Sequence, residues 1–424
     1  MIRLYSFVVL FLLSFTTILM AEEKHLVGGD VSLLPRYEQY NTPYYDQNGS
    51  KIDDVLLYMR DECGMNAMRV RLFVKPNASE AKDGVVQDLA YVKALGKRIK
   101  AAGLKFMLDF HYSDTWADPS NQKLPADWSD CETAEQKAER VYSYTKDCLD
   151  ELKAAGATPD FVQVGNEISY GMVGIQVHPY DVVYATVYPN LERDDWDGFL
   201  SVLTQGCKAV REVCPTAKII IHTERAAKAV DTEYFYQKLK DLDYDIIGLS
   251  YYPIWHAPIS TLAGTLSQLE KSFPTKQVQI VETAYNYNYW PTSGVDYDTR
   301  KTWPCSAAGQ QQFVKDLIAE LQKHDNVNGL YWWFPEENGN GGASWNANTI
   351  VINGWLNRGL WDNSTHKALP ALYELKTYRT DPNSLGTILF QEDDDVVYDI
   401  LGKRVSQMRR GNIYIRNGKK VVVR

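Results

Sequence analysis

The sequence predicts an α/β fold, namely a (β/α)8 TIM barrel with a short C-terminal β appendage. Eight short apolar runs alternate with helix-like segments between residues 25 and 334. Several helix-like segments end on a glycine directly before the next run. Polar and aromatic residues gather where the apolar runs end. Together, these three observations are typical of a closed barrel with a site at one mouth.

The eight predicted strands are HLVGGDVS from residue 25, NAMRVRLF from 66, LKFMLDFH from 104, DFVQVGNE from 160, KIIIHT from 218, DIIGLSYY from 245, QVQIVET from 277 and NGLYWWF from 328. Between them, segments such as LAYVKALGKRIKAAG and QQQFVKDLIAELQKHD place apolar residues three to four positions apart, which indicates helices. An open doubly wound sheet is the alternative. However, no GxGxxG or GxxxxGK[ST] loop follows any of these strands, so the usual nucleotide site of such a sheet is missing.

The C-terminal ends of all strands in a (β/α)8 barrel converge on one face, where catalytic groups are held. At these ends the sequence has Asp30, Arg69, Arg71, His111, Asn166, Glu167, His222, Thr223, Tyr251, Tyr252, Glu282, Trp332 and Trp333. A plain apolar core would not favour this set, so we expect a functional site at this mouth.

Glu167 ends the fourth predicted strand and Glu282 the seventh, so the fold would direct both carboxylates into one cavity. Two such carboxylates are the minimum equipment for glycoside hydrolysis, and a separation of about 5–5.5 Å gives retention through a covalent intermediate. An arginine of the second strand would keep Glu282 ionised, while Glu167 beside neutral partners would hold a proton. Either glutamate alone is equally explained by an ion pair at the mouth; the pair favours catalysis.

Aromatic residues are concentrated in the predicted loops of this chain, which has 11 Trp and 28 Tyr. They occur in HYSDTWADP, YYPIWH, AYNYNYW and WWF, which follow the third, sixth, seventh and eighth strands. Flat rings offer apolar faces to the C–H surface of a sugar, and the polar residues between them bind hydroxyl groups. Core packing explains about half of these rings, but it fits poorly where they alternate with Asn, Asp and His.

Six motifs in this order resemble glycoside hydrolase family 53, the endo-β-1,4-galactanases. The motifs are GGDVS, MRVRLFVKP, MLDFHYSDTWADP, QVGNE, IVETAY and GLYWWFPE, and the similarity covers roughly residues 25–380. The Asn-Glu pair marks only the wider clan of retaining (β/α)8 glycosidases, whereas DFHYSDTWADP is much more specific to the family.

The resemblance implies that Glu167 is the acid/base, Glu282 the nucleophile, and β-1,4-galactan of type I arabinogalactan and pectin the substrate. The binders that it implies near the scissile bond are Asn166, Arg69 or Arg71, His111, Asp114, Trp116, Tyr251 and Trp333. Which arginine supports the nucleophile stays open, because positions 69 and 71 face the same way on a strand.

The resemblance implies no organic cofactor. Some bacterial members of the family carry a calcium site in the loop after the seventh strand. Here that loop offers Asp296 and Asp298 but no dense run of oxygen ligands, so we expect no metal. The net charge of −9 excludes the basic surface that nucleic acids require.

Residues 1–21 have the layout of a secretory signal peptide, which predicts a secreted or cell-surface protein. A membrane anchor is the alternative, but the apolar run is shorter than the ~20 residues of a spanning helix. Six cysteines follow, and their pairing is not readable from the sequence. We expect a catalytic domain over residues 22–382, a β-rich tail over 383–424 with an Asn-Gly hairpin, and a monomer.

Two other functions fit the same residues. A barrel of the same clan could act on another β-glycan such as mannan or cellulose, or it could bind galactan without cleaving it. Presence of both glutamates disfavours the second alternative.

Overall fold

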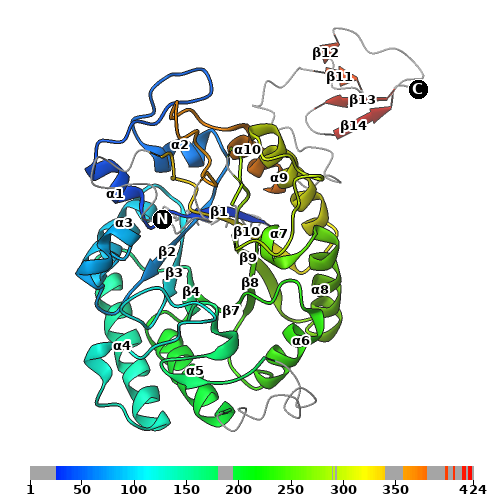
Figure 1. Ribbon diagram of the computed structural model, residues 1–424. Coiled ribbons are helices and arrows are strands. Elements are labelled where there is room, and N and C mark those ends of the chain that lie inside the picture. The colour runs from blue at the N-terminus through cyan, green and yellow to red at the C-terminus, as the bar shows by residue number, and fades with distance from the viewer. Residues whose placement is uncertain are drawn as a thin grey trace, which may run out of the picture.

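The computed structural model describes residues 25–179, 194–288, 290–291, 294–339 and 357–379, together with four short strands between 397 and 422. Eight parallel strands close into a barrel in the order β1-β10-β9-β8-β7-β4-β3-β2 (Figure 1). The strands are β1 (Leu26–Asp30), β2 (Ala67–Leu72), β3 (Lys105–Phe110), β4 (Phe161–Val164), β7 (Lys218–Thr223), β8 (Ile246–Tyr251), β9 (Gln277–Thr283) and β10 (Val327–Trp333). All eight coincide with the predicted strands, so the predicted TIM barrel is confirmed.

Helices surround the barrel on its outside (Figure 1). The α-helices are α1 (Leu34–Gln39), α2 (Val55–Asp61), α3 (Leu89–Ala101), α4 (Ala134–Ala154), α5 (Trp196–Val213), α6 (Ala229–Lys238), α7 (Pro253–His256), α8 (Ile259–Ser272), α9 (Ala307–Leu321) and α10 (Pro370–Glu374). Short 3₁₀ turns are η1 (Ala78–Asp83), η2 (Ala126–Trp128), η3 (Ile168–Tyr170) and η5 (Leu375–Arg379), and β5 (Gly171–Met172) pairs with β6 (Ile175–Gln176).

The ends of these helices follow the local sequence. Thr133 caps α4 by accepting the N–H of Gln136, whose side chain bonds back to the Thr133 N–H in a capping box. After α3 and α4 the chain turns at Gly103 and Gly156, with φ of 74° and 75°, where a side chain would be strained. The predicted glycine ends are therefore confirmed.

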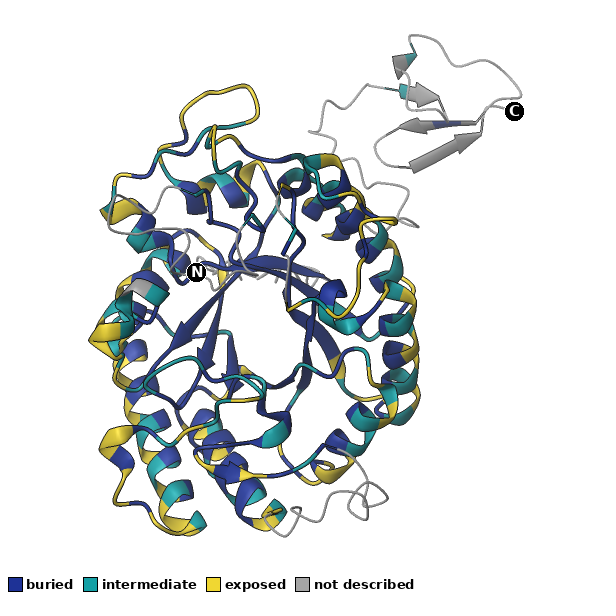
Figure 2. Cartoon of the chain, viewed as in Figure 1, coloured by how far each residue is buried: buried dark blue, intermediate teal, exposed yellow. Residues whose placement is uncertain are grey.

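Side chains on alternate strand positions fill the barrel in layers. The lowest layer is apolar and consists of Leu26, Ala67, Met107, Phe161, Ile220, Ile246, Val281 and Tyr331. Two positions further along each strand, inward residues such as Arg69, Asp109 and His222 form a polar layer that is also fully buried. The barrel strands as a whole are buried along most of their length (Figure 2). The larger apolar core lies between the strands and the helices. The polar layer is therefore held from below and from outside by tightly packed apolar groups.

The chain bends sharply at the end of β4. Gly165 has φ of 87°, and Glu167 has φ of 47° and ψ of 51°, in the left-handed region. Such a conformation costs a non-glycine residue about 1–2 kcal/mol and persists only where the surroundings enforce it. Because of this bend, both Asn166 and Glu167 line the mouth of the barrel instead of alternating between its two faces.

The C-terminal strands form a sheet of their own, with the order β12-β11-β13-β14. They are β11 (Val397–Asp399), β12 (Arg404–Val405), β13 (Ile413–Arg416) and β14 (Lys419–Val422). Arg416 pairs with Lys419 across antiparallel strands, which agrees with the hairpin predicted there.

The predicted signal peptide, residues 1–21, lies outside the described residues. Among the described residues, no helix has the length and the apolar character that a membrane crossing requires. All six cysteines lie in described parts of the chain, and each of them has a free thiol. Five of the six are buried, so their thiols pack as small apolar groups.

Candidate active site

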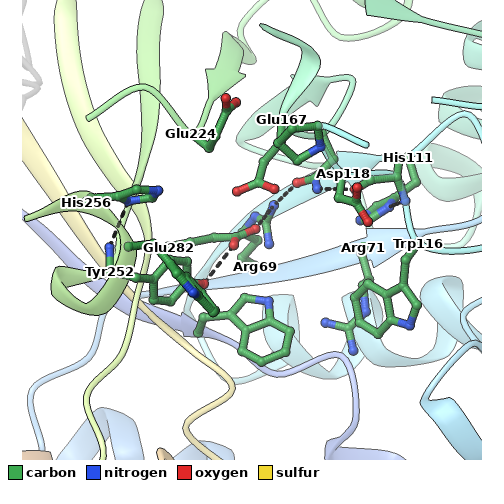
Figure 3. A pocket seen from close by; sticks show the side chains of 15 residues that line it. Arg69, Arg71, His111, Trp116, Asp118, Glu167, Glu224, Tyr252, His256 and Glu282 are labelled. Carbon is green, nitrogen blue, oxygen red and sulfur yellow. Dashed lines mark hydrogen bonds and ion pairs between the residues drawn. The ribbon is translucent and has the colours of Figure 1, made fainter. Parts of the chain in front are cut away.

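A cavity of about 340 Å³ opens at the C-terminal ends of the barrel strands (Figure 3). It is lined by Arg69, Arg71, His111, Trp116, Ala117, Asp118, Pro119, Asn166, Glu167, Glu224, Tyr252, Trp255, His256, Glu282 and Trp333. Eight of the ten residues predicted for the site are in this set, including both glutamates. The structure therefore brings most of the predicted constellation together.

Two predicted binders lie elsewhere. Asp114 accepts the backbone N–H of Lys75 at 3.0 Å and that of Ala126 at 2.8 Å, so its carboxylate holds a loop together. The Tyr251 hydroxyl donates to the carbonyl oxygen of Ala257 at 2.9 Å, and the side chain belongs to the core outside the barrel. Neither residue lines the cavity.

Glu282 lies at the end of β9, buried to 6% exposure, and three side chains contact its carboxylate. Arg69 Nη2 is 2.9 Å from Oε1, and the Tyr252 hydroxyl donates to Oε2 at 2.8 Å. Ser250 Oγ lies 3.4 Å from Oε2. Burial raises the pKa of Glu282, but the positive charge of Arg69 and the hydrogen bond from Tyr252 oppose this rise. The site thus favours the ionised form of Glu282 over that of its partner Glu167.

Arg69 connects Glu282 to the buried polar layer. Its Nη1 is 2.8 Å from Asp30, and its Nη2 is 2.8 Å from Asp109 and 2.9 Å from the amide oxygen of Asn166. Every one of these partners is almost completely buried. Such a network fixes the guanidinium in one position, so Arg69 is the arginine that supports Glu282. The choice that the sequence left open is therefore resolved.

Glu167 has different surroundings on the opposite side of the cavity. The Ser250 hydroxyl donates to its Oε1 at 2.6 Å, and the carboxylate of Glu224 lies in the same wall (Figure 3). Burial raises the pKa of Glu167 well above its usual value, and the negative charges of Glu282 and Glu224 raise it further. Burial and two neighbouring carboxylates thus raise the pKa of Glu167 more than that of Glu282, so of the two carboxyl groups Glu167 keeps a proton more readily.

The separation of the two carboxylates is limited by Ser250. Its Oγ lies 2.6 Å from Glu167 Oε1 and 3.4 Å from Glu282 Oε2, so these two oxygens are at most about 6 Å apart. Inverting glycosidases need about 6.5–9.5 Å between the carboxyl groups to admit a water molecule, and retaining enzymes have about 5–5.5 Å. The bound concerns this one pair of oxygens and is compatible with the shorter of the two separations.

Arg71 and two tryptophans, Trp116 and Trp333, form another wall of the cavity. Arg71 Nη1 is 2.9 Å from Asp30, and its guanidinium lies 4.4 Å from the ring centre of Trp116 and 5.9 Å from that of Trp333. Within the described part of the chain, Nε and Nη2 of Arg71 make no hydrogen bond. This wall thus presents apolar ring faces, with a buried guanidinium packed against them.

Several residues that line the cavity were not among the ten predicted site residues, although Tyr252 was noted at a strand end. Asp118 lies in the stretch HYSDTWADP, and Tyr252, Trp255 and His256 lie in YYPIWH, both of which were recognised as aromatic loops. Glu224 directly follows β7, and its position at a strand end was the signal that could have identified it. The sequence thus located the loops but not the individual side chains within them.

The described residues contain no group of three or more His, Cys, Asp and Glu side chains that could hold a metal ion. In the loop after β9, Asp298 pairs with Arg300 and is exposed. Residues 289 and 292–293 of this loop lie outside the described residues, as do residues 340–356 in the loop after β10.

Residues 26–375 match the sequence model of Glycosyl hydrolase family 53. The chain belongs to this family. Its membership makes it a glycoside hydrolase and confirms the resemblance found in the sequence motifs. The family 53 model spans the whole barrel, from β1 to η5, and so includes every residue that lines the cavity.

Relatives of this family 53 chain include proteins from bacteria and fungi. An uncharacterised protein of Niallia circulans is 34% identical over 324 residues, which are 74% of this chain and 84% of that protein. Arabinogalactan endo-β-1,4-galactanase A of Aspergillus niger is 31% identical over 325 residues, or 73% of this chain and 84% of the enzyme. A solved GH53 catalytic domain from Ignisphaera aggregans superimposes with a TM-score of 0.71 at 28% identity, covering 85% of this chain and 98% of that domain.

Proposed function

We propose that this chain is a retaining endo-β-1,4-galactanase, with Glu167 as the acid/base and Glu282 as the nucleophile. The observation that carries the proposal is a pair of carboxylates at most about 6 Å apart in unlike surroundings. One is paired with a guanidinium and the other faces a hydroxyl group and a further carboxylate. These are the two protonation states that the reaction needs at the same time.

In the first half-reaction, an oxygen of Glu282 attacks the anomeric carbon while Glu167 gives its proton to the departing glycosidic oxygen. The new bond joins the sugar to Glu282, and the leaving chain departs as an alcohol. Arg69 and Tyr252 hold the attacking carboxylate in place and keep it ionised. Once Glu282 is bound to the sugar its charge is lost, and the pKa of Glu167 therefore falls for the next step.

In the second half-reaction, water attacks the same carbon and ionised Glu167 takes its proton. The bond to Glu282 breaks, the carboxylate is released, and the product has the configuration of the substrate. Glu167 ends the cycle protonated, as it began. The reaction uses water and substrate only.

The Arg71, Trp116 and Trp333 wall would bind the sugar next to the cleaved bond. The rings supply apolar faces, and the guanidinium of Arg71 lies against them. His111 and Asn166 would contribute hydrogen bonds from the neighbouring strand ends. Asn166 also donates to the carbonyl oxygen of Ala117, which orients its amide.

The substrate class rests on family relatives. Curated proteins from Bacillus subtilis and Aspergillus niger that align with more than two thirds of this chain are endo-β-1,4-galactanases by name. We infer the same activity here, on internal bonds of the β-1,4-galactan in type I arabinogalactan and pectin. The predicted signal peptide at residues 1–21 would bring the enzyme to polymers that lie outside the cell.

Replacement of Glu282 with Ala tests the assignment. We expect release of galacto-oligosaccharides from galactan to fall at least about 1,000-fold, because no nucleophile remains. Glu139→Ala on the exposed face of α4 is the matched control and should keep full activity. Near-normal activity of Glu282→Ala would contradict the proposal.

Two further measurements address stereochemistry and substrate. Proton NMR of freshly released reducing ends should show the β anomer first, and an initial α anomer would contradict retention. Parallel assays on galactan, mannan and cellulose should show cleavage of galactan. Cleavage of only mannan or cellulose would reassign the substrate, and tight binding of galactan without turnover would indicate a binding protein.

A further inference from the structure

Ser250, at the end of β8, contacts both catalytic carboxylates and a buried histidine. Its Oγ lies 2.6 Å from Glu167 Oε1, 3.4 Å from Glu282 Oε2 and 2.8 Å from His222 Nε2. Ser250 and His222 are completely buried. A hydroxyl group has a single proton, so it can serve only one of these partners as a donor.

The tautomer of His222 follows from the groups around its other nitrogen. Nδ1 lies 3.0 Å from the side-chain nitrogen of Gln163 and 3.4 Å from the backbone nitrogen of Glu167, and both of these atoms carry hydrogen. Asn166 Oδ1 is also 3.1 Å from Nδ1, but the backbone N–H of Glu167 can only donate, so it decides the role of Nδ1. With two donors directed at it, Nδ1 is an acceptor, and the ring proton is on Nε2.

The charge state of His222 is consistent with a single ring proton on Nε2. Burial lowers the pKa of His222 well below its usual value, and the positive charge of Arg69 lowers it further. The imidazole is therefore neutral and has one N–H group. That group is Nε2–H, which donates to Ser250 Oγ.

The direction of the remaining bond is then determined. Ser250 Oγ accepts from His222 and donates its own proton to Oε1 of Glu167. This oxygen is 2.6 Å away, whereas Oε2 of Glu282 is 3.4 Å away. A carboxyl oxygen that accepts a short hydrogen bond is disfavoured as the site of the acidic proton. The proton of Glu167 is thus left to Oε2.

We propose that Ser250, oriented by His222, is a positioning residue that keeps Oε1 of Glu167 as an acceptor and assigns the transferable proton to Oε2. The same arrangement serves both half-reactions, because ionised Glu167 still accepts from Ser250 and receives the proton of water on Oε2. This inference rests on the proposed function of Glu167 as acid/base.

Ser250→Ala tests the inference through leaving groups of different basicity. On galactan the departing oxygen needs a proton, and we expect kcat/KM to fall roughly 10- to 100-fold, part of what general acid catalysis supplies. An aryl β-1,4-galactobioside with 2,4-dinitrophenol as leaving group needs no proton, and its kcat/KM should change less than about threefold. An equal loss on both substrates would indicate a merely structural role and overturn the inference.

The pH profile gives a second readout from the same variant. The hydrogen bond from Ser250 lowers the pKa of Glu167, so its removal raises that pKa. The alkaline limb of kcat/KM on galactan, where Glu167 loses its proton, should move to higher pH by roughly half to one unit. An unchanged limb would overturn the inference. Thr223→Val, which removes a buried hydroxyl beside His222 that contacts Tyr236, is the control and should leave the limb in place.

The tautomer is measurable without any substitution. Nitrogen-15 NMR of the unmodified protein, with His222 assigned by comparison with His222→Gln, should show hydrogen on Nε2. Hydrogen on Nδ1 would make Nε2 an acceptor, so that Ser250 would donate to His222 and not to Glu167, and this result would overturn the inference. Galactan cleavage that persists in Glu167→Gln and Glu282→Ala would refute the proposed function instead. Inactivity of both, combined with a Ser250→Ala variant that behaves as the unmodified enzyme, would refute only the role of Ser250.

Discussion

Tyr252→Phe removes one hydroxyl group that contacts the carboxylate of Glu282 and leaves the aromatic ring in place. The hydroxyl donates to Glu282 Oε2 at 2.8 Å in a site where Glu282 is 6% exposed. A hydrogen bond to a charged group contributes about 1.5–3 kcal/mol, and one pKa unit corresponds to about 1.36 kcal/mol. The bond lowers the pKa of Glu282, so its loss should raise that pKa by roughly one to two units.

The assay is the pH dependence of kcat/KM on galactan. Activity requires ionised Glu282, so its acid limb should move to higher pH in Tyr252→Phe by the same one to two units. Tyr251→Phe makes the identical chemical change one residue earlier, where the hydroxyl donates to Ala257 outside the cavity. An unmoved acid limb in Tyr252→Phe, or an equal shift in Tyr251→Phe, would refute the assignment of Tyr252 and the ionisation order of the two glutamates.

Two other predictions concern buried charges. Arg69→Met leaves three buried carboxylates without their shared cation, and we expect the free energy of unfolding to fall by about 3–5 kcal/mol in urea titrations; a loss below about 1 kcal/mol would contradict this. Glu336 is completely buried with its pKa raised to about 8, so the folded state binds its proton more tightly than the unfolded state. Stability should therefore fall as pH rises from about 4.5 to 8, and Glu336→Gln should flatten this dependence. A variant with the same slope as the unmodified protein would show that Glu336 does not titrate in this range.

The strands and the two glutamates were predictable because both depend on local signals. A near-continuous apolar run that ends on polar residues identifies a barrel strand and its C-terminal end. Which of Tyr251 and Tyr252 lines the cavity does not follow from the sequence of this strand alone. The pairing of β8 with β9 shifts register between Leu249 and Ser250, so the inward positions at the strand end depend on a neighbouring strand.

The arginine that supports Glu282 was unpredictable for a related reason. Arg69 and Arg71 both face inward, and what separates them is depth in the barrel. Arg69 reaches Asp109 and Glu282, whereas Arg71 reaches Asp30 and the tryptophan rings. Depth is set by the stagger of strands around the barrel, which no single strand sequence contains.

The buried wall beneath the cavity has an imbalance of charge with a consequence for the reaction. Leaving aside the imidazole of His111, which lies 3.1 Å from Asp109, two guanidinium groups, Arg69 and Arg71, face three carboxylates, those of Asp30, Asp109 and Glu282. A surplus anion in a dry site is unfavourable while the enzyme waits for substrate. As the glycosidic bond breaks, positive charge develops on the sugar ring and becomes the missing counterion. In the proposed reaction, the surplus negative charge would therefore favour the reacting sugar most near its transition state, which is where binding energy accelerates a reaction.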